Sequence, residues 1–320
     1  MNRRDFLASS ALAGIGILAG RTAGAAPFKT SLRKAMIRGV PTEEACIQLK
    51  DAGFQGIECN AWNVAPDAAK KARDVAEKAG IRIHSVLRGW TNFNGKNPAG
   101  DIASVETALN ACQGYGADAL LLVPCRIGVK PTPQPWEFDI TFDEKTAHVK
   151  TVVKGDNAQY AAYIEAQNHA TDTSRSAVQK LIPVAEKTGV KIALENVWNN
   201  LWVKPELFAN FVKSFDSPWV GAYFDIGNHV KYEAPQNWIP LLGDRIFKVH
   251  IKDFKLNADG KGGKFCRVGE GSVDWPVVRK ALDAIAYNGW LTNESGGFSL
   301  EELSKRFDLI IEGKDPGGRS

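Results

Sequence analysis

The chain has 320 residues, with 40 Lys and Arg against 36 Asp and Glu, and 44% of its residues are hydrophobic. This composition is typical of a globular protein and excludes a disordered or collagen-like chain. The formal net charge is only +4 and the basic residues are scattered, so nucleic acid is not an expected partner. Five Cys without CxxC spacing indicate neither a disulfide framework nor a zinc knuckle, and we expect buried thiols.

The first 25 residues have the pattern of an export signal. Arg3 and Arg4 precede an apolar run rich in Ala and Gly, from Ala8 to Gly20, and small residues follow at 23–25. This pattern is typical of a cleaved twin-arginine signal peptide. A membrane anchor is the alternative, but the run is short for a bilayer span of about 20 residues. We therefore expect the Tat translocase as a transient partner and a periplasmic or otherwise exported mature protein.

Past residue 30, short apolar runs alternate with amphipathic stretches. The apolar runs predict eight strands, at Lys34–Arg38, Gly56–Ala61, Arg82–Leu87, Ala119–Cys125, Lys191–Val197, Val220–Ile226, Ile246–Lys252 and Gly289–Glu294. The amphipathic stretches predict helices at Thr42–Ala52, Asp67–Ala79, Ile102–Tyr115, Ser174–Lys187, Pro205–Phe215, Pro235–Leu242, Trp275–Tyr287 and Leu300–Glu312. Strict alternation of eight such units predicts a single (β/α)8 TIM barrel, an α/β fold, over residues 30–313. No GxGxxG loop follows a strand, so an open dinucleotide-binding sheet is not favoured.

One connection is too long for this pattern. Residues 126–172 separate the fourth strand from its helix, and they include a further expected helix near Tyr160–Asn168. An insertion after a strand lies on the carboxyl-terminal face of a barrel, where active sites are built. We expect it to form a lid or a contact in a homo-oligomer. Pro183 is expected to kink the fourth helix or to shift its start.

Ionisable residues stand at the carboxyl-terminal ends of four consecutive predicted strands. They are Glu195, Asp225, His250 and Glu294. Strands of a barrel are normally almost continuously apolar, so these polar ends require an explanation. Because all the strands end around one mouth, we expect the four side chains to project toward one point.

A cation explains this arrangement. Three carboxylates and an imidazole in a low-dielectric mouth would repel one another and lose hydration unless a positive ion lay among them. The donor set, rich in oxygen with one nitrogen, favours Mn²⁺, with Mg²⁺, Co²⁺, Fe²⁺ and Zn²⁺ as alternatives. The competing explanation is that single members of the set are mouth residues satisfied by hydrogen bonds. The sequence therefore predicts one divalent metal ion per chain.

The segments that carry these residues resemble a known superfamily. They are Ala193–Asn196, Phe224–Asn228, Val249–Asp253 and Val268–Trp275. They are similar to the xylose isomerase-like TIM-barrel superfamily, and most of all to its sugar (phosphate) isomerase and epimerase group. The resemblance implies that Glu195, Asp225, His250 and Glu294 bind one divalent ion. It also implies that Glu195 and Glu294 are the catalytic acid and base on opposite faces of a bound sugar.

The chemistry of such a site is consistent with the resemblance. A metal ion bound to a carbonyl and its neighbouring hydroxyl lowers the barrier to loss of the adjacent C–H proton and stabilises the enediolate. Two carboxylates can then transfer the proton. Export argues against a phosphorylated substrate, and no phosphate-binding cluster is evident. We therefore expect a metal-dependent isomerase or epimerase that acts on a sugar or a sugar derivative.

The chain departs from ketose 3-epimerases at three positions. Those enzymes typically have His three residues after the metal-binding Asp, where this chain has Asn228. They also have Glu six residues after the first metal-binding Glu and Arg six residues after the metal-binding His, where this chain has Leu201 and Leu256. The hydrogen-bonding set for a free ketose is altered, so that particular epimerisation is in question.

Further side chains near the strand ends are candidates for contact with substrate. They are Trp62, His84, Trp198, Asn228, His229 and Lys252. Trp rings stack on the apolar faces of sugars, although core packing is the alternative for each Trp and for His84. Lys252 should point inward like His250, either to neutralise an enediolate or to pair with Glu294 or Asp253.

Two other functions remain open. The same ion and glutamates acting on a 3-keto-glycoside would take a proton at C2 and eliminate the C1 substituent, which makes the protein a glycoside lyase. A non-catalytic carbohydrate-binding accessory protein that retained the barrel is the third possibility. Product analysis with ketoses and with 3-keto-glucosides separates the first two.

Overall fold

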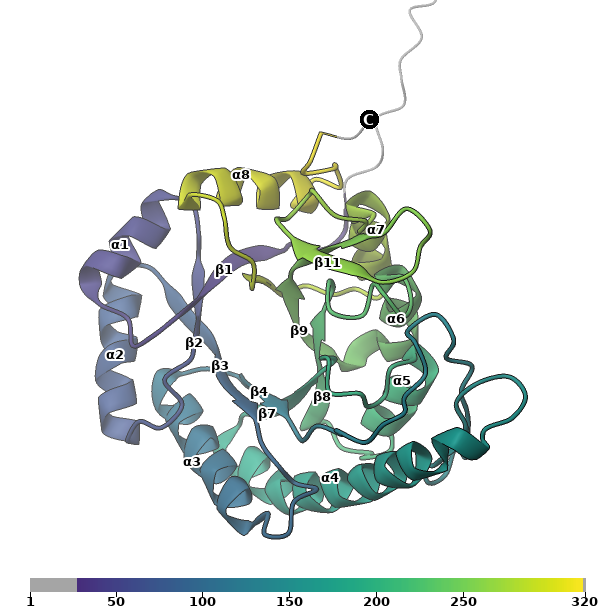
Figure 1. Cartoon of the computed structure of the whole chain (residues 1–320). Coiled ribbons are helices and arrows are strands. Elements are labelled where there is room, and N and C mark those ends of the chain that lie inside the picture. The colour runs from purple at the N-terminus through teal and green to yellow at the C-terminus, as the bar shows by residue number, and fades with distance from the viewer. Residues whose placement is uncertain (1–27, 319–320) are drawn as a thin grey trace, which may run out of the picture.

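A computed structural model describes residues 28–318 and confirms the predicted barrel. Eight parallel strands close in the order β1-β12-β9-β8-β7-β4-β3-β2, and Figure 1 shows them ringed by helices. The strands are β1 (Arg33–Arg38), β2 (Gly56–Cys59), β3 (Arg82–Trp90), β4 (Ala119–Val123), β7 (Lys191–Glu195), β8 (Val220–Asp225), β9 (Ile246–Ile251) and β12 (Trp290–Asn293). The predicted signal peptide, residues 1–25, lies outside the described residues.

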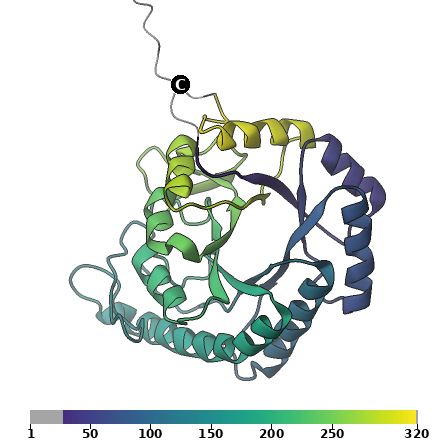
Figure 2. The same ribbon diagram turned by 180° about the vertical axis from the view of Figure 1, so that it is seen from behind.

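The eight helices form the outer ring, which is seen from behind in Figure 2. They are α1 (Glu43–Asp51), α2 (Pro66–Lys78), α3 (Ala99–Tyr115), α4 (Ala161–Thr188), α5 (Pro205–Lys213), α6 (Pro235–Leu242), α7 (Trp275–Ala284) and α8 (Leu300–Ile311). Thr42, Asp274 and Ser299 each accept a backbone N–H of the first helical turn, at 3.1–3.3 Å. These caps mark the starts of α1, α7 and α8, as side-chain oxygens at N-cap positions commonly do.

The fourth helix differs from its prediction. A single helix, α4, runs over 28 residues from Ala161, so it absorbs both the expected helix near Tyr160–Asn168 and the one expected to begin at Ser174. Pro183 lies inside α4 without ending it. The two predicted helices share one buried face, which includes Tyr163, Gln167, Ala170, Ser174, Ala177 and Leu181. Spacings of three and four residues keep that face continuous, and this periodicity outweighs the local effect of Pro183.

The strands are apolar on both faces because helices cover their outer side and other strands fill the inside. Every residue of β4 and of β8 is buried. Leu121, Val123, Ala193 and Tyr223 form a cluster of their own, separate from the main core. Tyr223 also lies at hydrogen-bond distance from Ser85 and Thr292, at 3.3 and 3.2 Å. A partly polar layer therefore lies inside the barrel beneath the ends of β8 and β9.

Two small two-stranded sheets lie outside the barrel, in the loops that follow β4 and β9. β5 (Thr141–Phe142) pairs with β6 (Val149–Thr151) in the insertion, and β10 (Asp253–Leu256) pairs with β11 (Gly263–Cys266) directly after β9. Neither hairpin was expected. Short 3-10 turns precede α4 (Ala158–Tyr160) and β9 (Gly243–Arg245). Across residues 28–318, none of the helices is both long and apolar enough to span a bilayer.

Candidate metal centre

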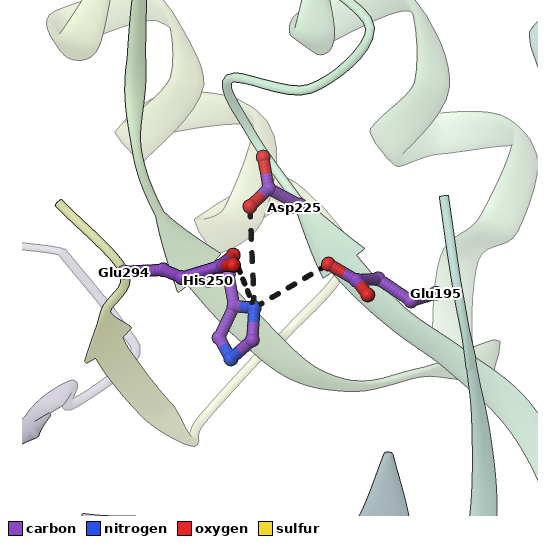
Figure 3. Close-up of side chains that lie close together, drawn as sticks. All are labelled: Glu195, Asp225, His250 and Glu294. Atoms are coloured by element: carbon purple, nitrogen blue, oxygen red, sulfur yellow. Dashed lines mark ion pairs between the residues drawn. The ribbon is translucent and has the colours of Figure 1, made fainter. Parts of the chain in front are cut away.

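The four predicted ligands come together at the mouth of the barrel. Glu195 ends β7, Asp225 ends β8, His250 lies near the end of β9 and Glu294 follows β12. One potential ligand atom from each lies within 4.8 Å of the other three. Figure 3 shows the three carboxylates arranged around the imidazole of His250. The geometry of the cluster is thus that expected from the strand ends.

The distances within the cluster suit a shared cation. His250 Nδ1 lies 3.0 Å from Glu294 Oε2, 3.7 Å from Glu195 Oε1 and 3.9 Å from Asp225 Oδ2. Within the described chain, three of these atoms are buried without a hydrogen bond: His250 Nδ1, Glu294 Oε2 and Asp225 Oδ2. Buried polar atoms without partners are costly and rare. Three of them aimed at one point fit a divalent ion.

The electrostatics of the cluster point the same way. Burial raises the pKa of Asp225 well above its usual range and also raises the pKa of Glu195. Burial would lower the pKa of His250, but the carboxylates of Glu58 and Glu294 outweigh it and raise that pKa well above its usual range. Without an ion, protons bound to Asp225, Glu195 and His250 would therefore offset the negative charge of the cluster. A metal ion would compete with these protons for the same atoms.

Lys252 adds a further positive charge at the edge of the cluster. Its Nζ lies 3.0 Å from Glu294 Oε2 and 3.6 Å from Asp225 Oδ2. These carboxylates raise the pKa of Lys252, although its burial acts in the opposite direction. Lys252 thus pairs with Glu294, while Asp253 points elsewhere and accepts backbone N–H groups of the 269–273 loop.

Asn228 orients two of the carboxylates. Its backbone N–H donates to Asp225 Oδ1 at 2.6 Å, and its side-chain Nδ2 donates to Glu195 Oε1 at 3.3 Å. Its Oδ1 accepts a hydrogen bond from Lys252 at 3.2 Å. Asn228 was predicted to bind substrate. That contact stays a prediction, and the structure shows that Asn228 holds two predicted metal ligands in place.

Glu58 is the functional candidate whose role the sequence did not reveal. It is fully buried in β2, and its Oε2 lies 2.6 Å from His250 Nε2. A carboxylate on the second nitrogen of a histidine fixes the ring and its tautomer so that the first nitrogen can bind a metal. The only sequence signal is a charged residue inside an apolar strand, Gly56–Cys59.

The other residues predicted to contact substrate lie at different distances from the metal cluster and at different depths in the barrel. Trp198 donates its indole N–H to the carbonyl of Asn228 and so borders the cluster. The ring of Trp62 lies farther round the rim, 4.3 Å beneath the guanidinium carbon of Arg88. His84 stacks on Trp290 with ring centroids 4.5 Å apart, in the interior layer below the ligands.

His229 packs into the wall of the barrel mouth. Its Nε2 lies 3.1 Å from the carbonyl of Val197, and its ring centroid is 4.8 Å from that of Trp238. Burial lowers the pKa of His229 to about 3, so the ring is neutral near pH 7. A neutral imidazole with Nε2 protonated would donate a hydrogen bond to that carbonyl. The structure therefore gives His229 a packing role and does not join it to the metal cluster.

A cavity of about 410 Å³ opens beside the cluster and is lined in part by Lys252 and Glu294. A second cavity of about 550 Å³ is lined by residues at the starts of the strands, including Arg33, Lys191 and Lys248. None of the four ligand residues lines that second cavity. The first cavity therefore offers space for a substrate next to the cluster.

A family model and a curated relative match this chain. Residues 46–307 match the family model described as xylose isomerase-like TIM barrel. An uncharacterised protein of Methanocaldococcus jannaschii is 31% identical over 152 residues, which cover 44% of this chain and 50% of that protein. The aligned part thus spans about half the length of this curated relative.

Solved structures of similar shape cover nearly the whole barrel. A D-tagatose 3-epimerase-like protein has a TM-score of 0.66 at 18% identity, covering 88% of this chain and 97% of that one. The 3-keto-D-glucoside 4-epimerase YcjR of E. coli has a TM-score of 0.63 at 13% identity, covering 88% and 99%. At such identities the likeness shows the fold alone. The family model, however, matches most of the chain, and the chain belongs to the xylose isomerase-like TIM barrel family.

Proposed function

We propose that this protein is a divalent-metal-dependent sugar isomerase or epimerase that moves a proton beside a carbonyl. The observation that carries the proposal is the convergence of Glu195, Asp225, His250 and Glu294, with ligand atoms within 4.8 Å of one another. The sugar epimerases among proteins of similar fold support the substrate class. A binding protein would not need two buried carboxylates next to an imidazole.

The four residues would hold the ion, and the ion would supply charge that polarises the substrate carbonyl. Glu195 and Glu294 reach the cluster from different strands, which suits removal of a proton by one carboxylate and its return by the other. Asn228 keeps Glu195 in position through its side-chain amide. Lys252, 3.0 Å from Glu294, places positive charge where an oxyanion would form on the substrate.

The second candidate is elimination from a 3-keto-glycoside. The positions that hold Glu and Arg in ketose 3-epimerases are Leu201 and Leu256 here, so a free ketose lacks two polar partners. Leu201 is almost fully buried, at 1% exposure, so that position offers no substitute contact. An E. coli protein of similar fold is a 3-keto-D-glucoside 4-epimerase. Proton removal at C2 with departure of the C1 substituent is therefore the alternative outcome at the same site.

Product analysis tests the proposal. The Mn²⁺-loaded protein is incubated in deuterated water with ketoses and with 3-keto-glucosides, and products are analysed by NMR. Isomerised or epimerised sugar carrying deuterium supports the proposal, whereas release of the aglycone alone supports elimination. We expect Glu195→Gln and Glu294→Gln each to lower kcat by about 10²–10⁴-fold. Glu106→Gln, at an exposed position on α3, is the control. Binding without turnover of either substrate class would contradict both enzymatic candidates.

We also propose that the protein is exported by the Tat translocase. The proposal rests on Arg3 and Arg4 ahead of the apolar run. Fractionation of cells that produce the full chain should place a shortened protein outside the cytoplasm. Changing both arginines to Lys should keep it inside, and unchanged export of that variant would refute the route.

A further inference from the structure

The cavity beside the metal centre is lined partly by residues of that centre and partly by residues outside it. Lys252 and Glu294 belong to the metal centre, while Phe265, Arg267 and Ser295 lie outside it. Because the two parts share one space of about 410 Å³, a molecule bound at Glu294 can extend toward Phe265. Ligand sites in proteins commonly have volumes of about 300–1,000 Å³. The cavity therefore has room beyond the reacting group of a small substrate.

Phe265 is exposed but held in one orientation. Its side chain lies on β11 and is 42% exposed. Its ring stacks on Trp198 with centroids 4.7 Å apart and meets Phe254 edge-on at 5.3 Å. Phe254 and Phe265 face each other across the β10–β11 hairpin, which fixes both backbones. An exposed and ordered aromatic ring at the edge of a site is typical of a binding surface.

The polar groups on this side of the cavity are few and partly engaged. Arg267 pairs with Glu270 through two contacts, at 2.5 and 3.0 Å. Ser295 donates its hydroxyl to Asn293 at 3.0 Å. These contacts use two of the five N–H donors of Arg267, but the lining of the cavity as a whole is mostly apolar. This wall therefore suits the apolar face of a ring.

We propose that Phe265 forms a subsite for a second ring that is linked to the reacting sugar, so that the substrate is a glycoside and not a free monosaccharide. This inference rests on the proposed function, because it assumes that the reacting sugar lies at Glu195 and Glu294. The Phe265 ring is 5.0 Å from Lys252 Nζ, which brings the subsite next to the reacting group. The recognised chemistry is a ring with an apolar face, from either an aromatic aglycone or a second pyranose.

Binding of unreactive glucosides tests the subsite without requiring turnover. Calorimetry on the Mn²⁺-loaded protein compares methyl, phenyl and glucosyl glucosides in both anomeric forms. We expect a phenyl or glucosyl glucoside to bind about tenfold more tightly than its methyl counterpart, and the preferred one identifies the second ring. Phe265→Ala should remove this preference, measured as the ratio of the two-ring to the methyl glucoside affinity in the same variant. Phe265→Leu keeps an apolar side chain without a ring and should also lose most of the preference for two-ring glucosides.

Ile47→Ala is the matched control, because Ile47 is 46% exposed on α1, away from the cavity. It should retain the preference for two-ring ligands. Equal affinity for all glucosides, absence of binding, or an unchanged preference in both Phe265 variants would overturn the subsite. The proposed function fails by a different result, which is the absence of turnover of every keto sugar by the wild-type protein.

Discussion

The role of Glu58 depends on a partner that only the folded barrel brings to it. It has no exposed surface, and its partner His250 lies 192 positions later in the chain. Nothing near Glu58 in the sequence indicates that partner. The four ligands, by contrast, were predictable because each lies at a strand end, where topology alone brings side chains together. Glu58 and His250 meet only because the barrel closes, since β2 and β9 are not neighbours in the sheet.

Glu58→Gln should weaken metal binding without removing a ligand. The amide keeps the shape of the side chain but loses the negative charge that supports His250. We expect Mn²⁺ affinity to fall about 10–100-fold, measured by calorimetry. Glu106→Gln removes an exposed carboxylate on α3 and should leave the affinity unchanged. Equal Mn²⁺ affinity of wild type and Glu58→Gln would show that Glu58 does not position His250.

His229 should make the stability of the fold depend on pH. Burial lowers its folded-state pKa to about 3, whereas an unfolded histidine has a pKa of about 6.5. Below pH 6.5 only the unfolded state takes up this proton, so the free energy of unfolding falls as pH falls toward 3. Between pH 7.5 and pH 5 the loss from this group is about 2 kcal/mol.

Urea unfolding of wild type and His229→Gln at these two pH values measures the effect. Glutamine can still donate to the Val197 carbonyl but does not titrate. The variant should lose about 2 kcal/mol less than wild type on acidification. Identical pH dependence of the two proteins would mean that His229 is protonated in the fold.

At the scale of elements, alternation predicted the barrel strands and most helices, but long-range packing decided the rest. The helix α4 is continuous because one buried face runs past Ser174 to Thr188, and no local residue marks that continuity. The β10–β11 hairpin was not predicted, since the strand Gly263–Cys266 is short, mostly exposed and without alternation of apolar and polar residues. Such a strand forms because the preceding strand, β10, pairs with it, and its own sequence pattern does not indicate it.

The carboxylate of Asp253 should hold this hairpin to the following loop. It accepts backbone N–H groups of Gly269 and Gly271 at 2.9 and 3.1 Å, and the indole N–H of Trp275 at 3.2 Å. Sequence analysis left Asp253 only as a possible partner of Lys252. In the structure it instead ties the 269–273 loop to β10.

Asp253→Ala should leave several buried donors without partners. We expect a loss of about 3 kcal/mol in the free energy of unfolding, with faster amide hydrogen exchange in residues 267–273. Asp259→Asn, in the exposed turn of the same hairpin, should change neither quantity. A stable Asp253→Ala protein with unchanged exchange would contradict the anchoring role.

At the scale of the whole molecule, closure of the barrel creates the metal centre. The strands β7, β8, β9 and β12 are neighbours in the closed sheet, so their ends deliver four donors to one point. Closure also buries Asp225, which raises its pKa. It brings the carboxylates of Glu58 and Glu294 close to His250, and they raise the pKa of the imidazole although burial alone would lower it. The fold thus positions the donors before any ligand binds, and an ion would relieve the proton uptake that burial imposes.

Metal binding is the most direct test of this account. Protein stripped with a chelator is titrated with Mn²⁺ at pH 7.5, and bound metal is counted by mass spectrometry after desalting. We expect one ion per chain, a higher melting temperature with the ion, and a large loss of both in Asp225→Asn. No bound ion in the wild type, or equal binding by Asp225→Asn, would contradict the central claim that the four strand ends form one metal site.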